Sequence, residues 1–190
     1  PHVIASKVFQ GCSQALHDTL TVLDKDAFEQ ALRLLSGAER VLIVGLGASG
    51  PMALELYNKL SRLRLNCQVQ TDVFLQVVQA VLLTNRDVLV ALSESGDATY
   101  SLRTVSEARL HGCSVICITG NALSQLAQLA NIVLLSVANE TPPEIISSRV
   151  AQHVLIEALY VALAMQNLNA TIERERTIAE AFTRPQLKTS

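Results

Sequence analysis

The chain has 190 residues, the size of one domain, of which 49% are hydrophobic and 17% are charged. A disordered chain carries more charge and fewer apolar residues, so this composition excludes disorder and predicts one sizeable core. Fifteen basic and seventeen acidic residues are scattered along the sequence and give a net charge of −2. Nucleic-acid binding by this chain alone is excluded, because contact with a phosphate backbone needs clustered cations.

No apolar run approaches the ~18 residues of a membrane span, so we expect a soluble chain without a membrane segment. The four cysteines have apolar neighbours and no Cys-x-x-Cys spacing; they are Cys12, Cys67, Cys113 and Cys117. This usage predicts reduced core thiols rather than disulfides or a zinc site, and we therefore expect a protein of the reducing cytoplasm. The histidines form no metal-ligand spacing with cysteines or carboxylates, and we expect neither a metal nor a cofactor.

Two helices are predicted at the N-terminus, within residues 1–37. Apolar residues recur every three to four positions from Ile4 to Leu23, which predicts an amphipathic helix that needs a partner surface. A second helix is expected to begin at Asp26, which forms a capping-box pattern with Glu29, and to end at Gly37. We expect these helices to pack on the rest of the chain and on a second copy.

The next segment, residues 38–168, alternates short apolar runs with helical patterns. The runs predict five buried parallel strands, at residues 41–44, 67–69, 88–92, 115–118 and 132–135. Helical patterns fall at about residues 52–63, 73–83, 99–110 and 123–129, followed by a long helix at about 142–166. Right-handed crossovers then predict a three-layer α/β/α sandwich with strand order 2-1-3-4-5. Residues 169–190 are expected to form a charged helix and a polar tail.

A glycine-rich loop follows the first predicted strand, where residues 45–51 read Gly-Leu-Gly-Ala-Ser-Gly-Pro. Glycines let the backbone approach an anion closely, and the helix that follows offers free N–H groups, so phosphate is the expected ligand. The same loop matches Gly-x-Gly-x-x-Gly, with Asp72 some twenty residues on, which leaves a dinucleotide site as an alternative. A tight turn without any ligand is a second alternative.

A second polar loop follows the third predicted strand, where residues 93–97 read Ser-Glu-Ser-Gly-Asp. The first and third strands are neighbours at the point where the strand order reverses, the usual ligand position in such sheets. Ser49, Ser93 and Ser95 are therefore expected around one small anion, which disfavours an extended pyrophosphate. Helix capping by Ser95 or Asp97 is the structural alternative, although it leaves Ser93 unexplained.

These residues carry a resemblance to a known family. Gly45-x-Gly47-x-Ser49, Ser93-x-Ser95-Gly96 and Ser124-x-Leu126 resemble the sugar isomerase (SIS) phosphosugar-binding fold over residues 38–168. The leading helices, with Leu23-Asp24 and Phe28, and the pattern Ser147-Ser148-Arg149-x-x-Gln152 resemble the effector domain of RpiR-type transcriptional regulators. The resemblance implies a homodimeric sensor of a phosphorylated sugar or sugar acid. It also implies that DNA is bound only through an N-terminal helix-turn-helix domain that is absent here.

The sequence departs from that family at two places. The second loop usually reads Ser-x-Ser-Gly-x-Thr-x-Glu, whereas this chain has Ala98 in place of the threonine and Tyr100 in place of the glutamate. Loss of the threonine hydroxyl removes one hydrogen bond and is expected to weaken phosphate binding by one or two decades. Phe74 stands where relatives often have a histidine that reaches the sugar.

An aldose–ketose isomerase is the alternative function, because enzymes of this fold move a proton between adjacent carbons with a carboxylate or imidazole. Glu144 and His153 are the candidates. Glu144 also fits a helix N-terminus that begins at Thr141, and we keep it as a ligand contact. His153 lies in an apolar helical pattern, which is typical of packing. Arg149 is an isolated cation that needs an anionic partner, either Glu140, Glu144 or a ligand.

We predict a non-catalytic effector-sensing domain with no catalytic residues. The predicted ligand-binding residues are Gly47, Ala48, Ser49, Gly50, Ser93, Ser95, Gly96, Asp97, Glu144 and Arg149. The long closing helix carries apolar residues on more than one face, from Val150 to Met165. A helix of this kind must be buried on more than its sheet side, and a second copy of the chain in a two-fold dimer is the expected cover.

Overall fold

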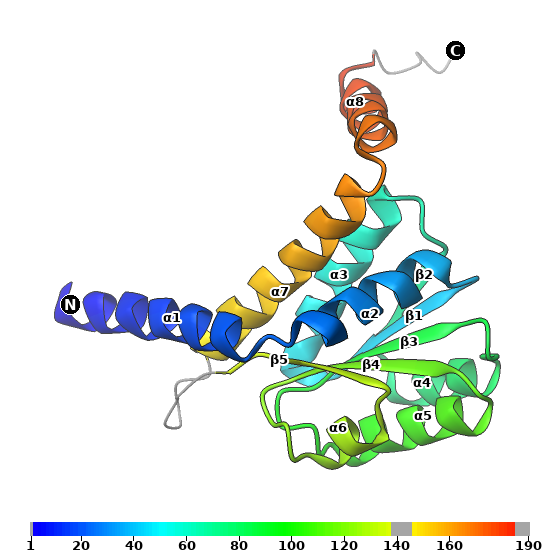
Figure 1. Ribbon diagram of the computed structural model, residues 1–190, viewed down its shortest axis with the longest axis horizontal. Helices are drawn as coiled ribbons and strands as arrows, with labels where there is room; N and C mark the ends of the chain where they lie inside the picture. The colour runs from blue at the N-terminus through cyan, green and yellow to red at the C-terminus, as the bar shows by residue number, and fades with distance from the viewer. Residues whose placement is uncertain (1, 138–145, 185–190) are drawn as a thin grey trace, which may run out of the picture.

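The computed structural model describes residues 2–137 and 146–184. In chain order the elements are α1 (His2–Val22), α2 (Lys25–Gly37), β1 (Val41–Gly45), the 3₁₀ turn η1 (Gly47–Ser49), α3 (Gly50–Arg62), β2 (Cys67–Gln70), α4 (Val73–Val81), β3 (Val88–Leu92), α5 (Thr99–Leu110), β4 (Ser114–Thr119), α6 (Gln125–Leu129), β5 (Ile132–Leu135), α7 (Ile146–Met165) and α8 (Leu168–Thr183) (Figure 1).

The five strands form one parallel sheet in the order β2-β1-β3-β4-β5, which confirms the predicted topology. Helices α2, α3 and α7 cover one face of the sheet, and α4, α5 and α6 cover the other (Figure 1). Alternate strand residues supply the two cores: Val41 and Ile43 point to the first, Leu42 and Val44 to the second. The prediction of five buried strands was wrong for β2, an edge strand whose residues are half-buried or exposed.

Most element bounds agree with the sequence patterns, and β3, α5 and β5 agree at both ends. The predicted cap of the second helix was wrong. The backbone N–H of Ala27 donates to Asp24 Oδ1 at 2.7 Å, so Asp24 is the N-cap and Asp26 lies inside the first turn. The predicted start of the closing helix near residue 142 lies outside the described residues, and α7 is described from Ile146.

Helix α1 extends away from the sheet and packs against α7 (Figure 1). Its buried residues are Ala15 and Thr19, and the Thr19 hydroxyl both donates to the Val137 carbonyl (3.2 Å) and accepts from the Val137 N–H (3.0 Å). Much of the predicted apolar stripe, including Ile4 and Leu20, is exposed. This chain alone therefore does not supply the full partner surface that the stripe needs.

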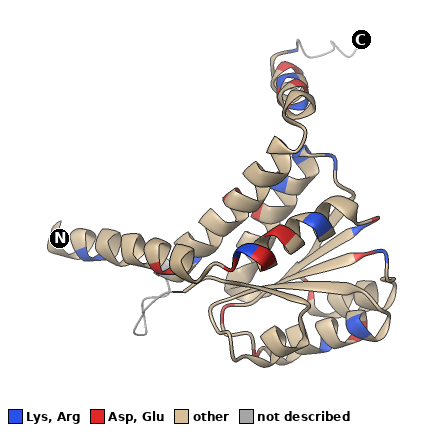
Figure 2. Cartoon of the chain, viewed as in Figure 1, with Lys and Arg blue, Asp and Glu red and all other residues tan. Residues whose placement is uncertain are grey.

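Charged residues are interspersed over the elements rather than gathered by sign in the view of Figure 2. Among the described residues no helix has both the length and the apolar character needed to cross a membrane. None of the four cysteines forms a disulfide. Burial raises the pKa of the Cys113 and Cys117 thiols to about 12. Cys12 and Cys67 are only half-buried, so the predicted core position was wrong for these two.

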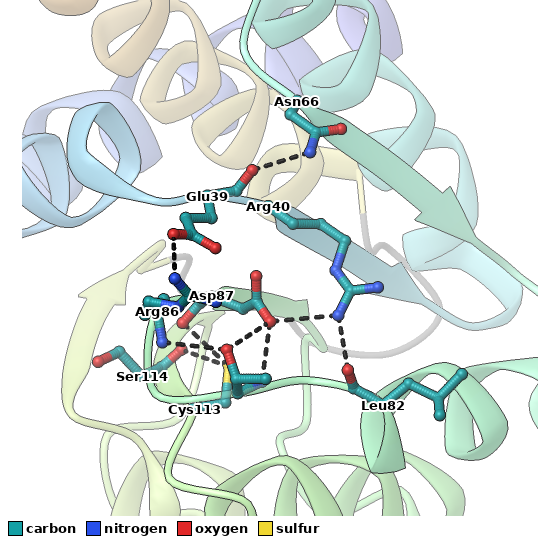
Figure 3. A network of polar contacts seen from close by, with 9 residues as sticks. Glu39, Arg40, Asn66, Leu82, Arg86, Asp87, Cys113 and Ser114 are labelled. Atoms are coloured by element: carbon teal, nitrogen blue, oxygen red, sulfur yellow. Dashed lines mark hydrogen bonds and ion pairs between the residues drawn. The ribbon is translucent and has the colours of Figure 1, made fainter.

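A polar network lies at the amino ends of β1 and β3, whereas the two polar loops lie at the carboxyl ends of these strands (Figure 3). Asp87 is its buried centre: Oδ2 accepts from the Thr84 N–H (2.8 Å), the Thr84 hydroxyl (3.0 Å) and Arg40 Nη2 (3.2 Å). Burial acts to raise the pKa of the Asp87 carboxyl, but the hydrogen bonds from Thr84 and Arg40 together outweigh it and hold that pKa below its ordinary value.

Replacing Asp87 by Asn removes the charge that faces Arg40, and we expect the free energy of unfolding to fall by about 1–3 kcal/mol at neutral pH. Because the folded-state pKa is depressed, the carboxylate stabilises the fold above its unfolded-state pKa of about 3.9 and loses that contribution as the pH falls through the folded value. The wild-type advantage in urea unfolding should therefore shrink below about pH 4. An advantage of constant size down to about pH 2 would contradict this account of the network.

Candidate functional site

A cavity of about 340 Å³ lies at the carboxyl ends of β1 and β3, which is large enough for a small ligand. We call it the site cavity. Its lining comes from the loop after β1, the loop after β3 and the first half of α7, and comprises Leu46, Ala48, Ser49, Ser93, Glu94, Ser95, Ala98, Arg149 and Gln152. The structure thus brings together five predicted site residues, and it adds Leu46, Glu94, Ala98 and Gln152. The site cavity lies where the strand order reverses, as the sequence predicted.

The loop after β1 holds its shape through two glycines. Gly45 allows the chain to fold back, since a Cβ atom there would lie 2.6 Å from the Ser49 carbonyl oxygen, and Gly47 has a left-handed φ of +53°. Ser49 is buried at 8% exposure beside the cavity, and its hydroxyl does not cap α3. The N–H groups of Ser49 and Gly50 already donate within the turn, to the carbonyls of Leu46 and Gly47.

The loop after β3 presents two serine hydroxyls whose oxygens accept from backbone N–H groups. The Gly96 N–H donates to Ser93 Oγ (3.2 Å) and the Asp97 N–H donates to Ser95 Oγ (3.4 Å). Each hydroxyl also keeps its proton, which can donate to an anion. Gly96 has a φ of +69°, and a Cβ atom there would collide with the Ser124 side chain, so the turn requires glycine.

Capping of α5 does not explain this loop. The N-cap of α5 is Ala98, and neither Ser95 nor Asp97 caps that helix. Asp97 Oδ1 instead accepts from the Gln125 N–H (3.0 Å) at the start of α6, and Asp97 does not line the site cavity. Ser124 caps α6 through the Ala127 N–H. Asp97 and Ser124 therefore hold α6 against the loop rather than face the cavity.

Glu94 and Gln152 form a contact that sequence reasoning missed. Gln152 Nε2 donates to Glu94 Oε2 at 2.5 Å, and Gln152 is only 2% exposed. The Glu94 carboxylate also lies directly against Gly120, where any Cβ atom would overlap it. This contact ties α7 to the loop after β3 across 58 positions of sequence. The only sequence signals were the position of Glu94 between two serines and that of Gln152 one turn after Arg149.

Arg149 lies at the rim of the cavity and is exposed. No carboxylate within residues 2–137 and 146–184 forms an ion pair with it. Its predicted partners Glu140 and Glu144 lie outside the described residues, as does the predicted ligand contact of Glu144. His153 does not line the cavity, and its Nε2 lies 3.7 Å from Glu157 Oε1 on α7.

Asp72, the acidic residue of the dinucleotide alternative, is already engaged. Its Oδ1 accepts from the N–H groups of Phe74 (3.0 Å) and Leu75 (2.9 Å), so it is the N-cap of α4. Asp72 does not line the site cavity, so its position is explained by the helix cap without a ribose. Phe74 is 79% exposed and does not line the cavity. Among the described residues no group of three or more His, Cys, Asp and Glu side chains could hold a metal ion.

Sequence comparison finds regulators among the relatives of this chain. An uncharacterized HTH-type transcriptional regulator of Thermotoga maritima is 31% identical over 171 residues, which cover 88% of this chain and 60% of that protein. The HTH-type transcriptional regulator RpiR of Escherichia coli K12 is 27% identical over 193 residues, which cover 99% of this chain and 65% of that protein. The chain thus spans about 60–65% of the length of these curated relatives.

Structural comparison finds the same fold in regulators and in enzymes. The Vibrio vulnificus NanR protein complexed with ManNAc-6P has a TM-score of 0.89 at 21% identity, covering 98% of this chain and 70% of that one. The sugar isomerase domain of an RpiR transcription factor from Sphaerobacter thermophilus has a TM-score of 0.86 at 20% identity, covering 93% and 98%. A phosphoheptose isomerase from Francisella tularensis has a TM-score of 0.69 at 19% identity, covering 87% and 98%.

These structural likenesses concern the fold alone. The family follows from the sequence, because a family model for the SIS domain matches residues 34–162, which is more than half of the chain. The match includes both polar loops and the part of α7 that carries Arg149 and Gln152. The chain therefore belongs to the SIS domain family.

Proposed function

We propose that this chain is the effector-sensing domain of a transcriptional regulator and that a phosphorylated sugar or sugar acid binds in the site cavity. The observation that carries the proposal is the convergence of Ser49, Ser93 and Ser95 on one cavity at the carboxyl ends of β1 and β3. Two of these hydroxyls accept from backbone N–H groups and keep their protons for an anion. The NanR structure, which contains ManNAc-6P, supports a sugar phosphate as the ligand class.

The relatives support a regulator rather than an enzyme. Those that match most of this chain are named helix-turn-helix regulators, and they extend beyond the part that it spans. In our proposal, DNA is bound by a helix-turn-helix domain in that further part, and the protein works in the cytoplasm. In this proposal the ligand changes the affinity for DNA only if it binds more tightly to one of two arrangements of the DNA-binding domains.

The site cavity offers little for isomerase chemistry. Moving a proton between adjacent carbons needs a base within hydrogen-bond reach of the substrate. Among the described lining residues the one carboxylate is Glu94, which accepts from Gln152, and no histidine is present. The isomerase alternative then depends on Glu94 or on Glu144, of which Glu144 lies outside the described residues. A coupled assay over several sugar phosphates should show no turnover above background; turnover that disappears in Glu144→Gln would support the isomerase instead.

The ligand is first identified by thermal shift with sugar phosphates, sugar-acid phosphates, NAD and NADP, and its affinity is then measured by calorimetry. Ser95→Ala should weaken binding tenfold or more, because a hydrogen bond to a charged group contributes about 1.5–3 kcal/mol. Ser93→Ala should do the same. Ser36→Ala, an exposed serine on α2 that lies outside the cavity, is the matched control. Unchanged affinity in both loop variants would remove the second loop from the site.

We also propose that the chain forms a two-fold dimer through α1 and α7. These helices pack together and leave large apolar side chains exposed, including Val3 (67%), Phe9 (78%) and Val161 (52%). Burial of these residues by a second copy removes apolar surface from water and stabilises the pair. Light scattering at micromolar concentration should therefore give the mass of two chains. The mass of one chain, with and without a bound sugar phosphate, would contradict the dimer.

A further inference from the structure

Helix α4 turns an apolar face to solvent. Five large apolar residues there are exposed, from 40% for Val81 to 79% for Phe74; they are Phe74, Leu75, Val78, Val81 and the C-cap residue Leu82. Residues three or four positions apart are neighbours on a helix surface, so these side chains share one side of α4, with Val78 at the centre. We call these five residues the α4 face. An exposed apolar group of this kind marks an interaction surface.

The α4 face is held in a fixed position. The buried Gln76 donates from Nε2 to the Gln70 carbonyl (2.9 Å) and so ties α4 to the end of β2. Asp72 caps the start of the helix, and the Leu82 carbonyl at its end accepts from Arg40 Nη2 (2.7 Å). A surface that is already ordered loses little conformational entropy when a partner binds it.

The segment that carries the α4 face is almost without charge. Within residues 67–85 the one charged residue is Asp72, and it is used as the helix cap. A nucleic acid or a strongly charged protein would need opposite charges here. Charged residues are depleted in the core of protein–protein interfaces. The fitting partner is therefore another uncharged apolar protein surface.

The α4 face has the same spacing when it is read in either direction. Phe74 and Leu82 lie four positions on either side of Val78, and Leu75 and Val81 lie three positions on either side. Two antiparallel copies of α4 related by a two-fold axis at Val78 would set Phe74 of each copy opposite Leu82 of the other. Leu75 would likewise lie opposite Val81. A two-fold interface requires a surface that is complementary to itself, and this spacing meets that requirement.

We propose that two copies of this chain pair through the α4 face, antiparallel, about a two-fold axis at Val78. This contact is separate from the dimer through α1 and α7. Helix α4 covers the opposite face of the sheet from α7, and α1 lies well away from it (Figure 1). The two contacts therefore engage different copies, and together they join two dimers into an assembly of four chains.

The α4 face is one short helix long, smaller than the ~800 Å² per partner of a standard interface, so the pairing is weak. Light scattering of the chain from about 5 to about 500 µM covers the range in which weak contacts form. The wild-type mass should rise at least twofold across this range. Val78→Glu should keep the low-concentration mass throughout, because it sets two carboxylates against each other at the axis.

Leu123→Glu is the matched control, since Leu123 is 84% exposed and lies outside the α4 face; its mass should follow the wild type. Thermal unfolding checks that both variants fold. A wild-type mass that does not rise overturns the proposal and leaves the α4 face to a different protein. A rise that persists in Val78→Glu shows growth through another surface and overturns it as well. If the low-concentration species is one chain, the same doubling is expected, so failure of the α1–α7 dimer is distinguishable.

The position of the axis is tested by Val78→Cys. Side chains at a two-fold axis face each other, so copper phenanthroline with dissolved oxygen should oxidise the two thiols to a disulfide that links two copies. The wild type and Leu123→Cys give the background from the native cysteines. Non-reducing electrophoresis should show the linked pair forming at least tenfold faster in Val78→Cys. Linkage at the background rate would overturn the antiparallel pairing.

Discussion

The parallel pairing of β1 with β3 is the constraint on which the site depends. The pairing runs from Val41 opposite Val88 to Gly45 opposite Leu92, so both strands end at the same level of the sheet. The loops that follow must therefore lie side by side, although almost fifty residues separate them in sequence. Buried apolar contacts on both faces of these strands fix that register, because a slip by one residue would turn each core side chain to the wrong face.

Backbone geometry then shapes the two loops. Gly45, Gly47 and Gly96 occupy positions where a side chain would collide or would strain a left-handed backbone. The third wall comes from α7, which is joined to the loop after β3 by the Gln152–Glu94 hydrogen bond. The same helix packs on α1, whose Thr19 bonds to Val137 just after β5. The cavity is thus enclosed by elements that the sheet and the first helix hold together.

The sequence predicted the sheet order and five of the nine residues that line the site cavity, because the strands and the two loops depend on local patterns. Apolar runs marked the strands, and glycine and serine after two of them marked the loops, so Ser49, Ser93 and Ser95 were found. The Glu94–Gln152 contact could not be found, since it joins residues far apart through tertiary packing. The capping-box pattern favours Asp26 as the helix cap, whereas Asp24 occupies that position. Two acidic residues so close together offered the same local pattern. The local pattern predicts Asp97 at the ligand, since its hydrogen bond to the start of α6 depends on tertiary packing.

The central claim is that an anion binds between the loops after β1 and β3. The most direct measurement is a crystal structure grown with the phosphorylated sugar that stabilises the chain most in thermal unfolding. Our account predicts the phosphate within hydrogen-bond distance of the Ser49 and Ser93 hydroxyls. A phosphate bound instead in the larger cavity of about 500 Å³ between α3 and α8, beside Arg64 and Arg174, would contradict it.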